Sequence, residues 1–394
     1  MGEDIVIVSA VRTPIGSYGG YFKDISSGHL ASIVIQEAVK RARIIPEQVD
    51  EVILGEVRQS TESSNVARVA ALRAGIPDTA PAFTVNRLCA SGMQAIASAV
   101  QQLTSNQANI VVAGGTENMS RGPIYLRNTR FGGDRVILID SNIEVGQQPQ
   151  EIYGKHLGMG ITAENVAERY NISREDQDAF SIESQRRTAK AIEAGTFKDE
   201  IIPVGVVVGK KALTITTDEH PRPETTKEKL SNLKPAFKEN GTVTAGNACG
   251  RNDGASALVL MKAGEASRLG MKPLAKIVDW STAGVSPEIM GIGPVPAVEK
   301  LLKRTEKKQE DIGLIELNEA FASQTLAVIR ELRLDSNKVN VNGGAIALGH
   351  PVGMTGARIV TTLIHEMIRR QERYGIATLC VGGGQGMAIM FETI

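Results

Sequence analysis

The chain has 394 residues, of which 42% are hydrophobic and 22% are charged, and its formal net charge is zero. This composition indicates a soluble globular protein of two domains or two halves, and it excludes the basic excess that favours binding to nucleic acid or membranes. Three cysteines are too few for a disulfide framework and match no zinc spacing, so a reducing compartment fits best.

The first residues lack the basic region and long apolar segment of a signal peptide, and no run of the chain is long enough to cross a membrane. We therefore expect a cytoplasmic protein with neither nucleic acid nor a membrane among its partners. With no net charge to attract it, any anionic ligand must be held by local groups.

Short apolar runs alternate with helical patterns over the first 120 residues. Strands are predicted at 5–9, 51–57, 81–85 and 110–115, and helices at 30–43, 66–74 and from 90 onward. Alternation of this kind indicates an α/β protein with helices on the faces of a mainly parallel sheet.

The periodic pattern breaks between residues 117 and 160, and a loop region of this length in a compact protein is usually functional. Ser173 then has the character of an N-cap for a helix that runs to about Ala194. Residues 217–229 are again irregular. A glycine-spaced stretch at 241–254 leads into a strand at 255–262.

The end of the chain repeats features of its beginning. The segment 50–56 resembles 311–317, and each is followed downstream by a strand that ends in consecutive glycines, at 114–115 and at 382–384. We therefore predict two similar βα halves with an inserted loop domain. The first half is 1–120 plus 245–270, the loop domain is 121–244, and the second half is 271–394.

Cys89 lies between a short apolar strand and a helix of small, largely apolar residues. The N–H groups and partial positive charge at a helix N-terminus stabilise a thiolate, which would lower the pKa of Cys89 and make it nucleophilic. The alternative is a small core residue that happens to be cysteine, because free cysteine is among the most buried residue types.

Three further segments carry polar residues at positions where a hydrophobic core would have apolar ones. Asn318 follows an apolar run, at the end of a strand where α/β proteins place their sites. His350 lies between glycines before a helix, and Cys380 ends a strand before a glycine turn. That turn lacks the lysine of a nucleotide phosphate loop and the spacing of a dinucleotide site.

Together these segments resemble the thiolase family. The matching motifs are 86–92 around Cys89, 318–322, 349–353 around His350, and 380–384, with further matches at 12–16, 159–165, 234–237 and 244–247. The resemblance therefore spans the chain. It implies a thiolase-like fold, in which the two halves form a layered αβαβα core.

The resemblance also implies roles for these residues. Cys89 would attack a thioester and carry the acyl group, activated by His350. Cys380 would be the acid and base of the condensation, and Asn318 would hold a water that, with His350, stabilises the enolate oxygen. The N–H groups of Cys89 and Gly382 would form a second oxyanion hole, which explains a glycine at a point of close approach.

Coenzyme A thioesters are the implied substrates, with no metal and no permanently bound cofactor. The residues expected to contact CoA are Arg222, Cys249, Met159, Phe237 and Phe321. The implied partner is a further copy of the chain, in a dimer or tetramer.

Departures from the family pattern lie beside these motifs. Cys249 stands where a serine is frequent, Arg251 replaces an apolar residue, and residues 354–355 replace Ala-Ser. Gly158 stands where acetoacetyl-specific members often carry histidine, and His156 lies two places earlier. This last difference puts narrow two-carbon specificity in doubt.

The leading hypothesis is an acetyl-CoA acetyltransferase, which condenses two acetyl-CoA to acetoacetyl-CoA. The alternative is a degradative 3-ketoacyl-CoA thiolase of broader chain length. A ketoacyl synthase would need a second histidine near its cysteine, whereas here a second cysteine is present. A non-catalytic acyl-CoA or lipid-binding protein on this fold should have lost Cys89, His350 or Cys380.

Overall fold

The computed structural model describes residues 3–132, 135–144 and 146–394. Its largest element is a ten-stranded sheet. The strands are β1 (Ile5–Arg12), β2 (Gly16–Ser17), β3 (Glu51–Gly55), β4 (Ala82–Val85), β5 (Ile110–Asn118), β10 (Asn252–Lys262), β11 (Ala275–Gly284), β12 (Leu314–Leu317), β13 (Tyr374–Val381) and β14 (Gln385–Thr393). Their order is β12-β13-β14-β11-β1-β10-β5-β3-β4, and β2 pairs with β10.

The expectation of a mainly parallel sheet is wrong. Within the described residues only β3 with β4, β3 with β5, and β12 with β13 pair in parallel, at the two ends of the sheet. The middle strands are antiparallel. A helix between two strands lets them pair in parallel, because it carries the chain back to the edge of the sheet where the first strand began. Between β13 and β14 there is no helix, and the tight turn at 382–384 reverses the chain, so these strands are antiparallel.

The two ends of the sheet have the same arrangement. On one side β3, β5, β10 and β1 follow one another, and on the other side β12, β13, β14 and β11 do so. In each series the first pair is parallel and the others are antiparallel. The two series meet where Val6 pairs with Lys276 and Ile7 with Ala275. The similar segments 50–56 and 311–317 occupy equivalent strands.

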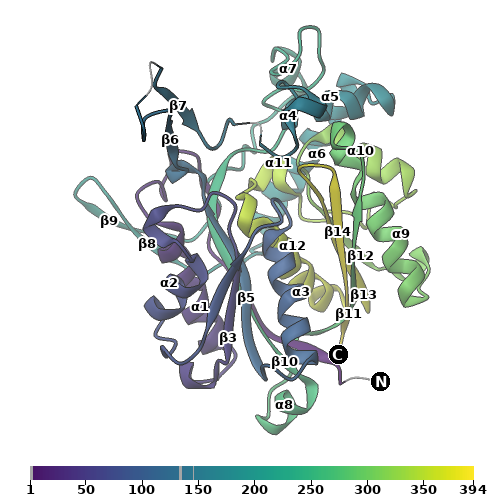
Figure 1. The fold of residues 1–394 in the computed structure, drawn as a ribbon. Helices are drawn as coiled ribbons and strands as arrows, with labels where there is room; N and C mark the ends of the chain where they lie inside the picture. The colour runs from purple at the N-terminus through teal and green to yellow at the C-terminus, as the bar shows by residue number, and fades with distance from the viewer. Residues whose placement is uncertain (1–2, 133–134, 145) are drawn as a thin grey trace.

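Helices and sheet stack in alternating layers (Figure 1). Helices α1 (Ser27–Arg41) and α2 (Val66–Arg73) cover one outer face, and α9 (Pro294–Thr305) and α10 (Ala322–Glu331) cover the other. Helices α3 (Ser91–Thr104) and α12 (Val352–Arg370) lie between the two parts of the sheet. A Cβ atom at Gly92 would lie 2.7 Å from the backbone nitrogen of Ala357, so these central helices pack backbone to backbone. The layered αβαβα core is confirmed.

The remaining elements lie mostly between residues 119 and 231; in Figure 1 the helices among them lie at the top of the molecule, and the β8–β9 hairpin extends to the left. The predicted N-cap is confirmed, because Ser173 Oγ accepts a hydrogen bond from the backbone N–H of Asp176 at 3.0 Å. Two hairpins were not predicted, and residues 133, 134 and 145 of the expected loop lie outside the described part of the chain. The helices are α4 (Gln150–Tyr153), α5 (Met159–Arg169), α6 (Arg174–Glu193) and α7 (Lys227–Ser231), and the hairpins are β6 (Ile124–Arg127) with β7 (Ile137–Asp140) and β8 (Val204–Val208) with β9 (Lys211–Ile215).

Two short helices complete the structure: α8 (Ala263–Arg268) after β10, and α11 (Ala345–Leu348) before α12. A buried arginine fixes the loop region to the sheet. Arg12 at the end of β1 forms ion pairs with Glu200 at 2.6 Å and Asp218 at 2.7 Å. Among the described residues, no helix is long and apolar enough to pass through a bilayer.

Candidate active site

A cavity of about 420 Å³ opens where the ends of β3 and β5 and the beginnings of α3 and α12 meet the loop region. It brings together seven of the ten residues that the sequence analysis selected. They are Cys89, Met159, Phe237, Cys249, Phe321, His350 and Gly382. Asn318, Cys380 and Arg222 do not line it.

Cys89 lies in a tight turn between β4 and α3, as predicted. The turn requires Leu88 to adopt φ +46°, a left-handed conformation that is costly for a residue with a side chain. Two side chains hold it: Asn86 Oδ1 accepts from the Leu88 N–H at 2.9 Å, and Ser91 Oγ donates to the Leu88 carbonyl at 2.7 Å. The strain is therefore maintained by the residues on both sides, and the Cys89 side chain remains partly exposed in the cavity.

The prediction of a lowered pKa for Cys89 is wrong, because its surroundings raise the pKa of the thiol. Burial raises the pKa of the Cys89 thiol, and this effect exceeds the opposing hydrogen bonds from the backbone N–H groups of Gly382 and of Cys89 itself. Helix α3 begins only at Ser91, with Ala90 as its N-cap, so the thiol precedes the helix end. Cys89 therefore needs a neighbouring base to become a nucleophile.

His350 has the form that a base requires. Thr355 Oγ1 donates its single proton to the Pro351 carbonyl at 2.9 Å, so it accepts from His350 Nδ1 at 2.6 Å. The proton is thus on Nδ1, and His350 Nε2 is unprotonated; it is buried without a hydrogen-bond partner in the described structure. Burial, followed by the charge of Arg358, lowers the pKa of His350 to about 3, so the ring is neutral.

Cys380 and Asn318 do not line the cavity, although Asn318 lies two residues before Ala320, which does. Cys380, at the end of β13, is fully buried in a cluster with Met159 and Phe321, which line the cavity. Burial raises the pKa of Cys380 well above its ordinary value, and the nearby Cys89 adds to this. Both polar atoms of the Asn318 side chain are buried and lack a partner among the described residues. This side chain is free to bind a water or a substrate oxygen.

Gly382 has no side chain, so its backbone lines the cavity directly. A Cβ atom there would lie 3.1 Å from Leu88 Cδ1 and 3.2 Å from Gln147 Cγ, so a side chain would crowd the space beside Cys89. Hydrogen bonding by the N–H groups of Gly382 and Cys89 lowers the pKa of the Cys89 thiol, against the larger effect of burial. Two N–H donors at one point can stabilise a negatively charged oxygen.

Four of the five residues expected to contact CoA line the cavity, and Arg222 does not. The Phe237 ring packs edge-on against Phe321, with 6.3 Å between centroids, and remains 46% exposed. The Cys249 N–H donates to the Ala320 carbonyl at 3.0 Å, and burial raises the pKa of the Cys249 thiol to about 12. Arg222 is exposed on the loop region, and its backbone N–H donates to Gln185.

Sequence reasoning missed three residues of this site. Arg58 lines the cavity just after β3, Gln147 lines it from the loop before α4, and Thr355 fixes the tautomer of His350. A charged residue immediately after a buried strand, at the edge where such sheets place their sites, was the signal for Arg58. Nothing in the sequence pattern distinguishes Gln147 from its neighbours.

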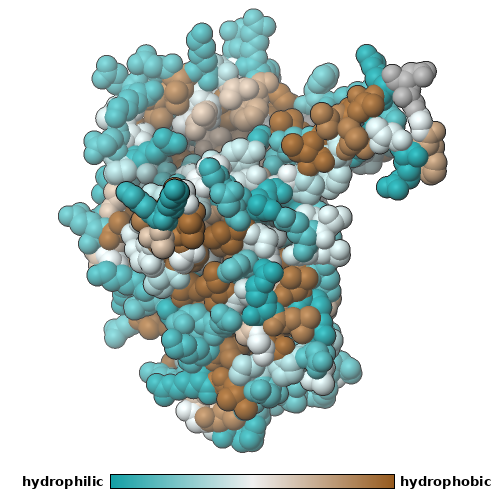
Figure 2. Space-filling view, turned by 90° about the vertical axis from the view of Figure 1, so that its left-hand side faces the viewer, coloured by the Kyte–Doolittle hydropathy of each residue, from teal (hydrophilic) through white to brown (hydrophobic). Residues whose placement is uncertain are grey.

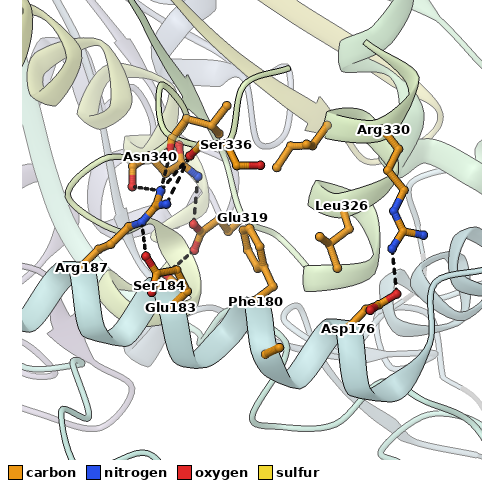
Figure 3. Close-up of a pocket in the computed structure, with 13 residues that line it drawn as sticks. Asp176, Phe180, Glu183, Ser184, Arg187, Glu319, Leu326, Arg330, Ser336 and Asn340 are labelled. Atoms are coloured by element: carbon orange, nitrogen blue, oxygen red, sulfur yellow. Dashed lines mark hydrogen bonds and ion pairs between the residues drawn. The ribbon is translucent and has the colours of Figure 1, made fainter. Parts of the chain in front are cut away.

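A second cavity, of about 260 Å³, lies between α6 and α10 (Figure 3). Asp176 pairs with Arg330 at 2.7 Å, and Glu183 pairs with Arg187 at 2.7 Å. Glu319 accepts hydrogen bonds from Ser184 at 2.6 Å and from Asn340. None of its lining residues has a buried side-chain polar atom without a partner. These contacts tie α6 to the end of β12 and leave no group available for chemistry.

Comparison with known proteins decides the family. Residues 5–264 match the family model for the thiolase N-terminal domain, and residues 271–393 match the model for the thiolase C-terminal domain. The chain belongs to the thiolase family. An acetyl-CoA acetyltransferase from Syntrophomonas wolfei is 49% identical to this chain, and the match covers 100% of each protein. A probable acetyl-CoA acyltransferase from Staphylococcus aureus is 47% identical over 98% of each chain.

Solved structures of thiolases agree with this assignment. The Bacillus anthracis acetyl-CoA acetyltransferase superposes with a TM-score of 0.97 at 50% identity, covering 100% of this chain and 99% of that one. Human mitochondrial 3-ketoacyl-CoA thiolase in complex with CoA superposes with a TM-score of 0.94 at 44% identity, covering 100% and 98%. The thiolase-like fold is confirmed, and the protein is an enzyme of this family.

Proposed function

We propose that this thiolase condenses two acetyl-CoA to acetoacetyl-CoA and CoA, and catalyses the reverse thiolysis, through an acyl group carried on Cys89 Sγ. One observation carries the proposal. Cys89 shares a cavity with His350, whose Nε2 is unprotonated and lacks a partner among the described residues. A thiol with a raised pKa beside a neutral imidazole is the pair that general-base activation requires.

In the first half-reaction the Cys89 proton moves to His350 Nε2 while Sγ attacks the thioester carbon. The oxygen of the intermediate takes hydrogen bonds from the N–H groups of Cys89 and Gly382. CoA then leaves as its thiol with a proton returned to its sulfur. The effect of both N–H groups on the pKa of Cys89 supports this assignment.

In the second half-reaction Cys380 removes a proton from the α-carbon of another acetyl-CoA. Asn318 holds a water that, with His350, stabilises the enolate oxygen, and the carbanion attacks the acyl group on Cys89. The buried, unpartnered amide of Asn318 supports its role, as does the burial of Cys380 next to Phe321 in the cavity wall. A buried cysteine of raised pKa is a stronger base once ionised.

We further propose that the pantetheine arm of CoA lies along Met159, Cys249, Phe237 and Phe321, and that Arg222 contacts the CoA phosphates at the surface. The half-exposed Phe237 ring and the exposed, cationic Arg222 support this path. CoA thioesters are then substrates, and no permanently bound cofactor is needed.

Thiolysis of longer 3-oxoacyl-CoA is the second candidate function. Gly158 is the N-cap of α5 and lines the cavity without a side chain, while the exposed His156 lies at its rim. A histidine at 158 would fill space that a longer acyl chain needs. The similarity to human mitochondrial 3-ketoacyl-CoA thiolase supports this candidate as well.

We propose a homo-oligomer, a dimer or a tetramer. The β6–β7 hairpin projects as an arm with exposed apolar side chains, seen at the upper right of Figure 2, and such a surface is usually covered by a partner. Its exposed apolar residues include Ile124, Leu126, Phe131, Val136, Ile137 and Leu138. The division of the chain at 1–120 plus 245–270, 121–244 and 271–394, a cytoplasmic location and a place in fatty acid metabolism also remain proposals.

Incubation with acetoacetyl-CoA and CoA tests the function directly. We expect the magnesium-enhanced enolate absorbance of acetoacetyl-CoA to fall as two acetyl-CoA form. With a Cys89→Ala variant, the absorbance should stay constant because acetoacetyl-CoA is not cleaved. Retained activity in that variant would contradict the proposal, as would an inactive wild-type protein that binds acetoacetyl-CoA.

A further inference from the structure

Several parts of the chain line the cavity that holds Cys89. The proposed CoA path comprises α5, Phe237 and residues 248–251. Val57 and Arg58, after β3, and residues 142–144 line the same cavity. An acyl group transferred to Cys89 would lie in this cavity, within reach of the side chains in its wall.

Arg58 has a fixed backbone and an unpartnered side chain. Glu117, in β5, accepts hydrogen bonds from the N–H groups of Arg58 at 2.9 Å, Val57 at 3.1 Å and Gly353 at 2.9 Å. The guanidinium of Arg58 has no hydrogen bond or ion pair to any described residue, and its Nε is buried. It is close enough to Cys89 for its charge to lower the pKa of that thiol, against the larger effect of burial.

The acidic groups around Arg58 form no ion pair with its guanidinium among the described residues, although its charge lowers the pKa of the buried Glu117 against the larger effect of burial. Glu117 turns its oxygens to the three backbone N–H groups, and Glu144 pairs with Arg127 at 2.8 Å. Burial, followed by the charge of Glu117, raises the pKa of Glu56 to about 8. Glu56 is therefore protonated near neutral pH and carries no negative charge that could pair with Arg58. A partly buried cation without a direct counterion is costly unless a ligand supplies one.

We propose that Arg58 binds a carboxylate at the end of the acyl chain, so that the enzyme acts on 3-oxoacyl-CoA derived from dicarboxylic acids. This inference rests on the proposed thiolase function and specifies its substrate class. The planar guanidinium matches a carboxylate with two parallel hydrogen bonds. The CoA phosphates are not the anion it binds, because the pantetheine arm holds them away from the thioester.

The reaction keeps the ordinary balance of thiolysis. Cys89 Sγ attacks the 3-oxo carbon, the bond between C2 and C3 breaks, and C2 takes a proton and leaves as acetyl-CoA. CoA thiol then takes the shortened acyl group from Cys89. Its product is a CoA thioester that still carries the terminal carboxylate, and Arg58 holds that carboxylate throughout.

Matched substrates test the inference. We compare kcat/KM for thiolysis of 3-oxoadipyl-CoA with that of 3-oxohexanoyl-CoA, and of the corresponding pair with eight carbons, since each pair differs only by carboxylate against methyl. We expect the carboxylate member to be preferred in at least one pair. Arg58→Met should lower that preference about 10- to 100-fold, as loss of a charged hydrogen bond does, and Arg58→Lys should lower it less.

The ratio within a pair removes any effect of Arg58 on Cys89 itself, because that effect acts on both substrates alike. The matched control is Arg251→Met, since Arg251 is a second arginine that lines the cavity but is exposed, over the ring of Tyr18 at 6.0 Å. It should leave the ratio unchanged. A wild-type preference for both methyl substrates would overturn the inference, and so would equal losses on both members of a pair in Arg58→Met. Acetoacetyl-CoA is the separate check: if it is not cleaved, the thiolase function itself fails.

Discussion

The two cavities of this enzyme differ in how their polar groups are satisfied. Between α6 and α10, each charged side chain in the wall has a partner, as Figure 3 shows for Asp176 with Arg330. Around Cys89, the described structure leaves His350 Nε2, Arg58 Nε and Gln147 Oε1 buried without one. The neighbours Asn318 and Glu319 differ in the same way, because Glu319 is fully engaged and Asn318 is not. Unsatisfied groups, rather than the presence of a cavity, identify the reactive site.

This difference has an energetic meaning. A buried polar group without a partner costs about 1–3 kcal/mol, and a fold tolerates several such groups at one place only where other contacts hold them. Here the central helices supply those contacts, and Thr355 in α12 and Ser91 in α3 orient the two reacting segments. Binding of the substrate offsets the free-energy cost of these unpartnered groups, because the substrate supplies their hydrogen-bond partners.

After the complete loss expected at Cys89, the largest effect is expected at Cys380. Cys380→Ser should lower the rate of acetyl-CoA condensation by about 10²–10⁴-fold, because a serine hydroxyl does not remove the α-proton as a thiolate does. Thin-layer or absorbance assays of acetoacetyl-CoA formation measure this. A loss below tenfold would show that Cys380 is a buried core residue and not the base.

A smaller loss is expected at Thr355. Thr355→Val removes the acceptor for His350 Nδ1–H and lets the proton move to Nε2, the atom that must accept one from Cys89. Activity should fall about 10- to 100-fold, the range found for partners that orient a functional histidine. Thr355→Ser, which keeps the hydroxyl, should restore it; equal losses in both variants would point to packing instead.

At the surface, Arg222 should affect binding alone. Arg222→Ala should raise the KM for CoA several-fold and change kcat little, as happens when an interaction is equal in the ground and transition states. Titration of initial rates with CoA measures both constants. An unchanged KM would remove Arg222 from the CoA path, and Arg333→Ala, far along the chain from this loop, is the control for loss of surface charge.

The smallest effect is expected in the cavity between α6 and α10. Asp176→Asn breaks a half-exposed ion pair with Arg330, so it should reduce the free energy of unfolding by about 0.2–1 kcal/mol and leave kcat and KM unchanged. Denaturant unfolding and steady-state kinetics measure these quantities. A loss of thiolysis without a loss of stability would make this second cavity functional, against the distinction drawn here.

Much of this architecture could be predicted from the sequence. Apolar periodicity located the strands on either side of Cys89 and the long helix after Ser173, and the repeat of 50–56 in 311–317 indicated two similar sheet halves. The antiparallel centre could not be predicted, because β10 enters the sheet far from its neighbours β1 and β5 in the sequence. The raised pKa of Cys89 was missed for a related reason: burial arises from contacts that join distant segments, and a local pattern does not reveal it.

The acyl relay through Cys89 is tested most directly by mass spectrometry of the protein after incubation with acetyl-CoA alone. We predict one acetyl group on the peptide that contains Cys89, absent in Cys89→Ser and still formed, more slowly, in Cys380→Ser, because CoA is a good leaving group and needs little help from Cys380. Acetylation located on Cys380 or Cys249 would contradict the account. So would its complete loss in Cys380→Ser, which would make that cysteine a support for the nucleophile and not the base of the second step.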